Sequence, residues 1–366
     1  AGDDEMLCFL TVAGTVRCSG KSDSLGYNQN GDNNTVGDGV GASLAEKGDI
    51  TLVSAEEKRL GLYAVSLDNS TDHSVCALLS DGITVRCWGK NLFVHNVTNG
   101  TIGNDENIHD AAAIPFLQTA DLDAGIRIIS INKGRDTVFA ILSDGSIRAA
   151  GNNSSGQLLQ GNTTNLTSST TANLNLASGA KALQVSGHRS VQVITNTFAT
   201  DNTQAWGSGM EGRHGLATTD DIGDNETTAL PVTMGAQIKQ LAVGPNKACA
   251  LTTAGMLRCW GNGNNGGLGY GDSSTIGDDE TPGAITTGIG GTPDVAVVSG
   301  TEKVTDIAAN YQSFCAVIDD DRIRCWGHYQ KGKLGVPGKS DHVGNNSGEM
   351  PPADTYVWDN PDAGLL

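Results

Sequence analysis

Short apolar runs alternate with glycine-containing turns along the whole chain. One run, Val75-Cys76-Ala77-Leu78-Leu79, is followed by the turn Ser80-Asp81-Gly82 and by a second run from Ile83 to Trp88. A short apolar run that ends at an Asp-Gly turn is typical of a buried strand entering a tight hairpin. Most hairpins are preceded by a further strand-like segment, such as Lys303 to Asn310. The pattern therefore predicts several short antiparallel strands per segment and an all-β fold.

The same hairpin recurs six times, and successive closing glycines are 54 to 69 residues apart. Two copies have similar sequences, Cys249 to Gly261 and Cys315 to Gly327. A third, Phe139 to Gly151, has the same spacing without cysteine. The closing glycines are Gly20, Gly89, Gly151, Gly207, Gly261 and Gly327. Such repeats predict a radial array of small antiparallel sheets. We expect one domain, residues 1–366, with repeats at about residues 6–71, 72–134, 135–189, 190–246, 247–311 and 312–366.

The eight cysteines form four pairs, each ten or eleven residues apart within one hairpin: Cys8/Cys18, Cys76/Cys87, Cys249/Cys259 and Cys315/Cys325. Where Phe139 replaces the first cysteine, Ala149 replaces the second, as expected of bonded partners. Residues opposite each other at a non-hydrogen-bonded position have Cα atoms ~4.5–5.5 Å apart, which suits a disulfide. We therefore predict four hairpin disulfides and a secreted, extracellular or cell-surface location.

The residues around Cys249 carry a family resemblance. They follow the pattern C-A-L-x-x-x-G-x-x-R-C-W-G-x-G-x-x-G-x-L-G-x-G, which resembles the repeat of the regulator of chromosome condensation family. The resemblance covers essentially the whole chain and is strongest at 247–311 and 72–134, whereas Ser19 and Ala150 stand where the family has tryptophan. It implies a β-propeller, usually of seven blades, of which six repeats are visible here. With its disulfides, the chain resembles a secreted, bacterial-type variant of the family.

The charge argues against the chromatin role that the family name suggests. The formal net charge is −18, from 41 acidic and 23 basic residues, whereas binding to nucleic acid needs basic surface. One arginine recurs just before the second cysteine position of a hairpin, at Arg17, Arg86, Arg148, Arg258 and Arg324. Because Arg86 and Trp88 share one face of a strand, we expect these arginines to stack on indole rings. No apolar run reaches the ~18 residues needed to span a membrane.

Acidic loops recur after the hairpins. They are Ile102-Gly-Asn104-Asp105-Glu106, Ile222-Gly-Asp224-Asn225-Glu226 and Ile276-Gly-Asp278-Asp279-Glu280, with Val36-Gly-Asp38-Gly39 related. Clustered carboxylates could hold calcium, with Asp278, Asp279, Glu280, Asp224 and Glu226 as candidate ligands. None of the loops has the ligand spacing of an EF-hand. Loop capping or a contact between blades is the simpler interpretation, and we expect no other cofactor.

No catalytic motif is found. The polar residues three positions before the first cysteine site are His73, Asp136, His188, Asn246 and Gln312, and they could line a shared funnel or support the backbone. We find no Ser/His/Asp motif, no HExxH and no P-loop, and we can place no carboxylate pair for a glycan-active enzyme. We therefore expect that the chain is not an enzyme.

Asparagine acceptors for N-glycosylation are dense, and several matches in an Asn/Thr-rich chain arise by chance. Each candidate begins Asn-x-Ser/Thr: Asn33, Asn69, Asn96, Asn99, Asn152, Asn153, Asn162, Asn165, Asn225 and Asn345. The segment from Asn152 to Thr167 is the polar loop in which we would look for glycans first. We expect a glycoprotein.

The first hairpin has no strand-like segment before it. Only Ala1 to Glu5 precede Met6, and the stretch from Thr355 to Leu366 could supply that strand in its own chain or in a neighbouring subunit. The sequence thus favours a secreted, non-catalytic structural or adhesive module that could assemble with copies of itself into a filament. The alternative is a module that binds another extracellular protein through its acidic loops, resembling the secreted propeller inhibitor of β-lactamases.

Overall fold

The structure is a computed structural model that describes most of the chain. The described residues are 6–20, 25–27, 36, 43–70, 73–90, 101–102, 108–111, 113–166, 171–174, 176, 180–185, 189–195, 200–310, 312–319, 321–329, 334–336 and 341–355. The chain divides into two compact units, residues 1–191 with 221–229 and residues 192–220 with 230–366. Each unit is described by itself below.

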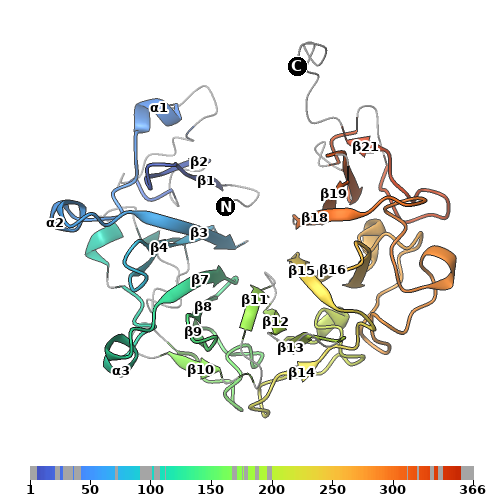
Figure 1. Ribbon diagram of the computed structural model, residues 1–366, viewed down its shortest axis with the longest axis horizontal. Coiled ribbons are helices and arrows are strands. Elements are labelled where there is room, and N and C mark those ends of the chain that lie inside the picture. Colours follow the sequence, from blue (N-terminus) through green and yellow to red (C-terminus); the bar gives the residue numbers. More distant parts are fainter. Residues whose placement is uncertain are drawn as a thin grey trace. The chain divides into compact units, whose positions relative to one another are not determined.

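The first unit contains a two-stranded sheet and two four-stranded antiparallel sheets (Figure 1). Their strands, each sheet given in spatial order, are β1 (Met6–Leu10) and β2 (Val16–Gly20); β3 (Ala64–Ser70), β4 (Ser74–Leu79), β5 (Val85–Lys90) and β6 (Thr101–Ile102); and β10 (Ala172–Leu174), β9 (Ile147–Gly151), β8 (Thr137–Leu142) and β7 (Ile128–Lys133). Short helices occur in the segments that connect one sheet to the next along the chain: α1 (Leu44–Lys47), α2 (Ala55–Arg59), α3 (Thr119–Asp123) and the 3₁₀ turn η3 (Ile108–Asp110).

The second unit contains one three-stranded and one four-stranded sheet, and the unit boundary passes through a further sheet ordered β11–β12–β13–β14. The strands are β11 (Ala180–Val185), β12 (Ser190–Thr195), β13 (Thr203–Gly207) and β14 (Leu230–Pro231); β15 (Ile238–Val243), β16 (Lys247–Thr252) and β17 (Leu257–Gly261); and β18 (Val304–Ala309), β19 (Ser313–Ile318), β20 (Ile323–Gly327) and β21 (Asp354–Thr355). The 3₁₀ turns are η4 (Met210–Gly212), η5 (Asn264–Gly266) and η6 (Ile289–Gly291).

The hairpins are those that the sequence predicts. The paired cysteines lie directly opposite each other, as Cys76 and Cys87 do between β4 and β5. The fold is therefore an all-β propeller of antiparallel blades with disulfide-stapled hairpins, and the predicted fold class is confirmed. No helix among the described residues is long and apolar enough to cross a membrane.

The sheets are out of phase with the sequence repeats. The strand β3 ends before residue 72 and β18 before residue 312, so each lies in the repeat that precedes the hairpin it pairs with. The strands β7 and β15 likewise precede residues 135 and 247. Each of these sheets therefore takes its first strand from the preceding repeat.

Buried tryptophans and glycines join neighbouring blades within each unit. The Trp88 ring is fully buried, and a Cβ atom on Gly26, from the repeat before, would lie 2.8 Å from its Cδ1. A Cβ on Gly215 would lie 3.0 Å from the Trp260 ring, and one on Gly269 would lie 2.9 Å from the Trp326 ring. The glycine at this position, which follows leucine in Leu25-Gly26 and Leu268-Gly269 and histidine in His214-Gly215, therefore lets the turn of one blade pack on the tryptophan of the next.

First strands of neighbouring blades lie side by side, β3 with β7 in the first unit and β15 with β18 in the second (Figure 1). They are joined by side-chain hydrogen bonds. The backbone N–H of Lys133 donates to the Asp68 carboxylate at 2.8 Å, and the Gln240 amide donates to the Asp306 carboxylate at 2.6 Å. Polar contacts thus add to the apolar packing between blades.

Candidate functional site

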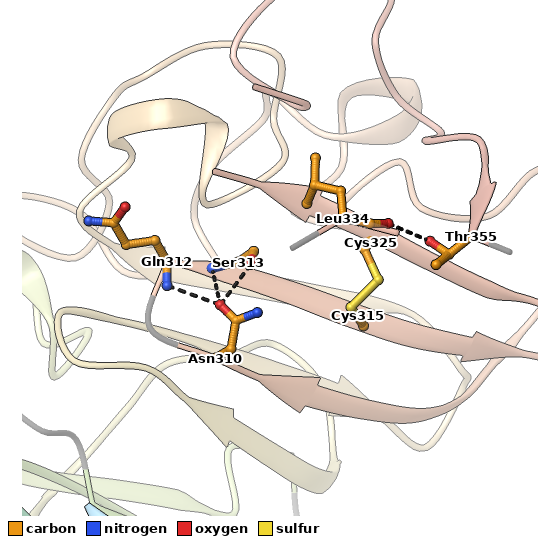
Figure 2. Close-up of a disulfide and its surroundings, with 7 residues drawn as sticks. All are labelled: Asn310, Gln312, Ser313, Cys315, Cys325, Leu334 and Thr355. Atoms are coloured by element: carbon orange, nitrogen blue, oxygen red, sulfur yellow. Dashed lines mark hydrogen bonds between the residues drawn. A yellow bond between two sulfur atoms is a disulfide. The ribbon is translucent and has the colours of Figure 1, made fainter. Parts of the chain in front are cut away.

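The four predicted disulfides are present, one in each of four hairpins: Cys8–Cys18, Cys76–Cys87, Cys249–Cys259 and Cys315–Cys325. Their Cα atoms are 4.0 to 4.1 Å apart, as at a close non-hydrogen-bonded pair. Figure 2 shows Cys315 and Cys325 bridging β19 and β20. Each closes a loop of only 10 or 11 residues, so its chain-entropy contribution is about 3 kcal/mol at most.

The recurring arginines bind carboxylates, and no stacking of these arginines on tryptophan is found in the described part of the chain. The Arg86 guanidinium donates to both Glu57 oxygens, at 2.7 and 3.0 Å, and to the Leu52 carbonyl oxygen at 2.6 Å. Arg148 binds Asp121 at 3.1 Å. A nearby carboxylate offsets the cost of burying a guanidinium, which a neutral indole does less well.

The other arginines at this position of the hairpin also bind carboxylates. Arg258 binds Asp294 at 2.8 Å and also donates to the Met234 carbonyl, and Arg17 binds Asp49 at 2.7 Å. Arg324 binds Glu302 at 2.9 Å, Asp354 at 2.8 Å and the Val297 carbonyl at 2.8 Å. These arginines therefore fix connecting segments onto the blades.

Three of the carboxylates come from caps that the sequence analysis missed. Ser54 and Glu57 form a capping box at α2, and Glu57 then binds Arg86. Gln118 with Asp121, and Ser299 with Glu302, repeat the spacing ahead of β7 and β18. The Arg86 guanidinium lowers the pKa of Glu57 to about 2. The S-x-x-E spacing before a strand was the available signal.

The acidic loops form contacts between blades within each unit. Ile276 pairs with Gly261 of its own blade, and the next residue, Gly277, packs on Gly212 of the preceding blade. Gly223 packs on Gly156 in the same way. The sequence Val343-Gly344-Asn345 takes this role in the last blade, against Gly266, and the sequence analysis missed it because it lacks an acidic residue there.

One acidic loop gathers carboxylates. Oxygen atoms of Asp278, Asp279 and Glu280 lie within 4.8 Å of one another. Burial, together with the Asp279 and Asp278 carboxylates, raises the pKa of Glu280 to about 7. Asp224 and Glu226 form no corresponding group among the described residues, and Glu226 accepts the Gly223 N–H at 2.8 Å. Calcium binding stays a prediction.

The polar residues three positions before the first cysteine site, where the second strand of each sheet begins, make local contacts. The Asp136 carboxylate accepts from Arg189 at 2.9 Å, and the Asn246 amide donates to Glu211 at 3.3 Å. Figure 2 shows the Asn310 side-chain oxygen accepting the backbone N–H groups of Gln312 and Ser313, at 3.1 and 2.9 Å. His73 has a positive φ of 58° in the corresponding turn, and His188 lies outside the described residues. These contacts support the backbone, and a shared funnel stays a prediction.

A buried lysine distinguishes the blade of β15 to β17. Lys247 pairs with Gly261, the position that Ser74, Thr137 and Ser313 occupy in other blades. The residue is only 3% exposed. Burial lowers the pKa of Lys247 to about 8, and the Glu211 carboxylate partly offsets this effect.

Lys247→Met is expected to stabilise the chain by about 2 kcal/mol at neutral pH, because it keeps the length of the side chain and removes the buried charge. Below pH 8 the buried amine of Lys247 is charged in the folded state, and this charge lowers the stability of the wild type. Between pH 8 and 10.5 the unfolded state binds the extra proton, so the stability of the wild type rises with pH and the advantage of the variant shrinks. Urea unfolding of both proteins at pH 7 and pH 10 measures this, and equal differences at both pH values would contradict it.

The glycosylation candidates differ in accessibility. Asn152 and Asn153 are buried, and Asn153 Nδ2 donates to the Asn162 carbonyl at 2.6 Å. Asn162, Asn165 and Asn225 are exposed and Asn345 is half-buried. Asn33, Asn96, Asn99 and the side chain of Asn69 lie outside the described residues. Glycosylation stays a prediction, directed at the exposed sites.

One face of the first blade is exposed where other blades are buried. Leu7 and Phe9 on β1 are each 45% exposed. Next to the first cysteine site, other blades carry fully or almost fully buried residues: Val75, Val138, Ala248 and Phe314 before it, and Ala77, Ala140, Ala250 and Ala316 after it.

The first-blade face is the one that meets a preceding blade elsewhere. Val75 pairs with Trp88, whose ring contacts Gly26 of the blade before. In the first blade Leu7 pairs with Ser19, which stands at the tryptophan position. Phe9 in place of alanine and Ser19 in place of tryptophan are the signals in the sequence that mark this face.

Comparison with known proteins supports the repeat assignment. The model of the regulator of chromosome condensation (RCC1) repeat matches residues 238–266. The mitochondrial RCC1 domain-containing protein RUG3 of Arabidopsis thaliana is 31% identical over 139 residues, 38% of this chain and 28% of the relative. The ultraviolet-B receptor UVR8 of the same plant is 27% identical over 229 residues, 59% of this chain and 45% of the relative. The chain thus spans less than half the length of either relative.

Solved structures give the fold. Prp20p of Saccharomyces cerevisiae superposes with a TM-score of 0.67 at 16% identity, over 99% of this chain and 76% of that one. Human WBSCR16 superposes with a TM-score of 0.64 at 14% identity, over 92% and 78%. The matching repeat, the hairpin register and the tryptophan–glycine packing all indicate the same propeller fold. The chain is therefore a β-propeller, and its residues 238–266 match the repeat of the RCC1 family.

Proposed function

We propose that this chain is a secreted, non-catalytic, glycosylated propeller that serves as a structural or adhesive cell-surface module and associates with further copies of itself. The observation that carries the proposal is the face of β1 formed by Leu7 and Phe9, each 45% exposed. The four disulfides support an oxidising compartment outside the cytoplasm.

A second copy of the chain is the occupant that we assign to this face. Every other junction described within a unit buries the equivalent residues against a blade of the same repeat type, such as Val75 on the face that meets Gly26. A sheet face at the same repeat position as those junctions fits a blade better than it fits a small ligand. Burying both side chains on association contributes about 2–4 kcal/mol, a substantial part of a micromolar affinity.

Self-association is expected to depend on this face. Light scattering after size-exclusion chromatography is expected to show a mass that grows with concentration for the wild type, and negative-stain images to show assemblies. Leu7→Ser/Phe9→Ala is expected to remain monomeric over the same range, because the apolar area that drives association is removed. The matched control is Ile129→Ser, since Ile129 on β7 is an exposed aliphatic residue outside this face.

Three outcomes oppose the proposal. A wild type that is monomeric at every concentration removes self-association, and a double variant that assembles like the wild type removes this face as its site. A single stoichiometric protein captured from the secreted material, with no self-association, would favour the alternative of a module that binds another extracellular protein.

A further inference from the structure

A pair of histidines stands at one register position of the last blade. Gly327 and Val343 exchange two backbone hydrogen bonds, of 2.8 and 3.1 Å. The next residues outward, His328 and His342, are therefore directly opposite at a non-hydrogen-bonded position, where side chains share a face and approach closely. Their ring centroids are 4.9 Å apart.

Other blades carry different residues at this position. The equivalent pairs are Lys90 with Thr101, Asn152 with Asn165, and Asn262 with Thr275. In the blades whose two residues are described, the last one alone has imidazole on both sides. The pair is thus a local feature of this blade, and the repeat architecture does not require it.

The surroundings of the pair suit a bound cation. Tyr329 lies against both rings, with centroids 5.2 Å from His342 and 6.1 Å from His328. His342 Nδ1 is buried and has no hydrogen-bond partner among the described residues. The preceding residue, Asp341, adds a negative charge beside the pair, and its carboxylate accepts the His342 backbone N–H at 2.7 Å. A buried nitrogen without a hydrogen-bond partner is unfavourable, and a bound ion can offset this cost.

We propose that His328 and His342 bind a late first-row divalent ion of the zinc and copper(II) type. Two imidazoles bonded to one tetrahedral ion at about 2.1 Å have ring centroids about 5 Å apart, close to the 4.9 Å observed. Imidazole favours zinc, copper and nickel, whereas magnesium and calcium prefer oxygen ligands. The net charge of −18 concentrates cations near the surface.

Titration calorimetry of the purified full chain tests the site with ZnCl₂, CuCl₂ and MgCl₂ in turn. We expect one equivalent of zinc or copper to bind with measurable heat and magnesium to give none. His328→Asn/His342→Thr, which installs the pair found at Asn262 and Thr275, is expected to weaken binding at least tenfold. There are two control variants. His109→Gln removes a histidine that lies beside Asp110, and Asp279→Asn removes one carboxylate from the Asp278, Asp279 and Glu280 cluster. Neither is expected to change the affinity.

Electron paramagnetic resonance of the copper-loaded wild type provides a readout that does not depend on a variant. We expect hyperfine coupling from two nitrogen ligands. The proposal is overturned by a spectrum with oxygen ligands only, by an affinity that the double variant keeps while it remains folded by circular dichroism, or by equal binding of magnesium.

Discussion

Gly156→Ala is expected to destabilise the folded chain by about 3 kcal/mol or more. Gly156 has a φ of +69°, and a Cβ atom there would overlap the backbone of Gly223 and Asp224 in the neighbouring acidic loop. The φ alone costs about 1–2 kcal/mol. The overlap adds to it because backbone atoms cannot rotate away as a side chain can. Urea unfolding with the disulfides intact, followed by circular dichroism, measures the loss.

Gly125→Ala separates the two causes. Gly125 has a similar φ of +74° in the same unit, and a Cβ atom there meets nothing within 4 Å. Its loss is expected to be about 1–2 kcal/mol, the backbone effect alone. The difference between the two variants measures the contact between blades, and equal losses would show that this contact does not constrain Gly156.

Arg86→Met is expected to cost about 3 kcal/mol, because it leaves the Glu57 carboxylate and the buried Leu52 carbonyl without their donor. The Arg86 side chain is 8% exposed. The matched control is Arg17→Met, since Arg17 and Asp49 are 39% and 41% exposed and an exposed pair contributes less than about 1 kcal/mol. Similar losses in the two variants would contradict a role for burial.

The same pair gives a pH dependence. The pKa of Glu57 is lowered to about 2 in the folded chain, from 4.5. Its contribution is therefore complete above pH 4.5 and is lost as the pH falls toward 2. The stability difference between wild type and Arg86→Met is expected to shrink between pH 7 and pH 3, in urea unfolding at both values. A difference that is constant with pH would mean that packing, and not the ion pair, carries the effect.

The hairpins and disulfides could be predicted because their signals are local. A strand, a turn and a return strand occupy about a dozen residues, so the spacing of Cys249 and Cys259 in sequence determines their register. The closing glycines and the Leu-Gly elements are equally local. The fold class followed from repetition of these signals.

The arginine partners could not be predicted from spacing alone. Glu57 lies 29 residues before Arg86, whereas Asp294 lies 36 residues after Arg258. The connecting segments vary in length, so no fixed offset identifies the carboxylate. Only a recognised cap, as at Ser54, marks its position in advance. The same holds for contacts between blades, where Gly156 meets Gly223 across 67 residues.

The offset between repeats and sheets determines how this protein can be divided. A cut at residue 72 or 312 follows the sequence repeat but separates β3 or β18 from the hairpin that it pairs with. Cuts shortly before Ala64 or Val304 keep those sheets whole. A duplicated or transplanted repeat that follows the sequence boundaries therefore ends in an unpaired strand and lacks the first strand of its own sheet. The gain or loss of one repeat therefore also changes the sheets of the neighbouring blades.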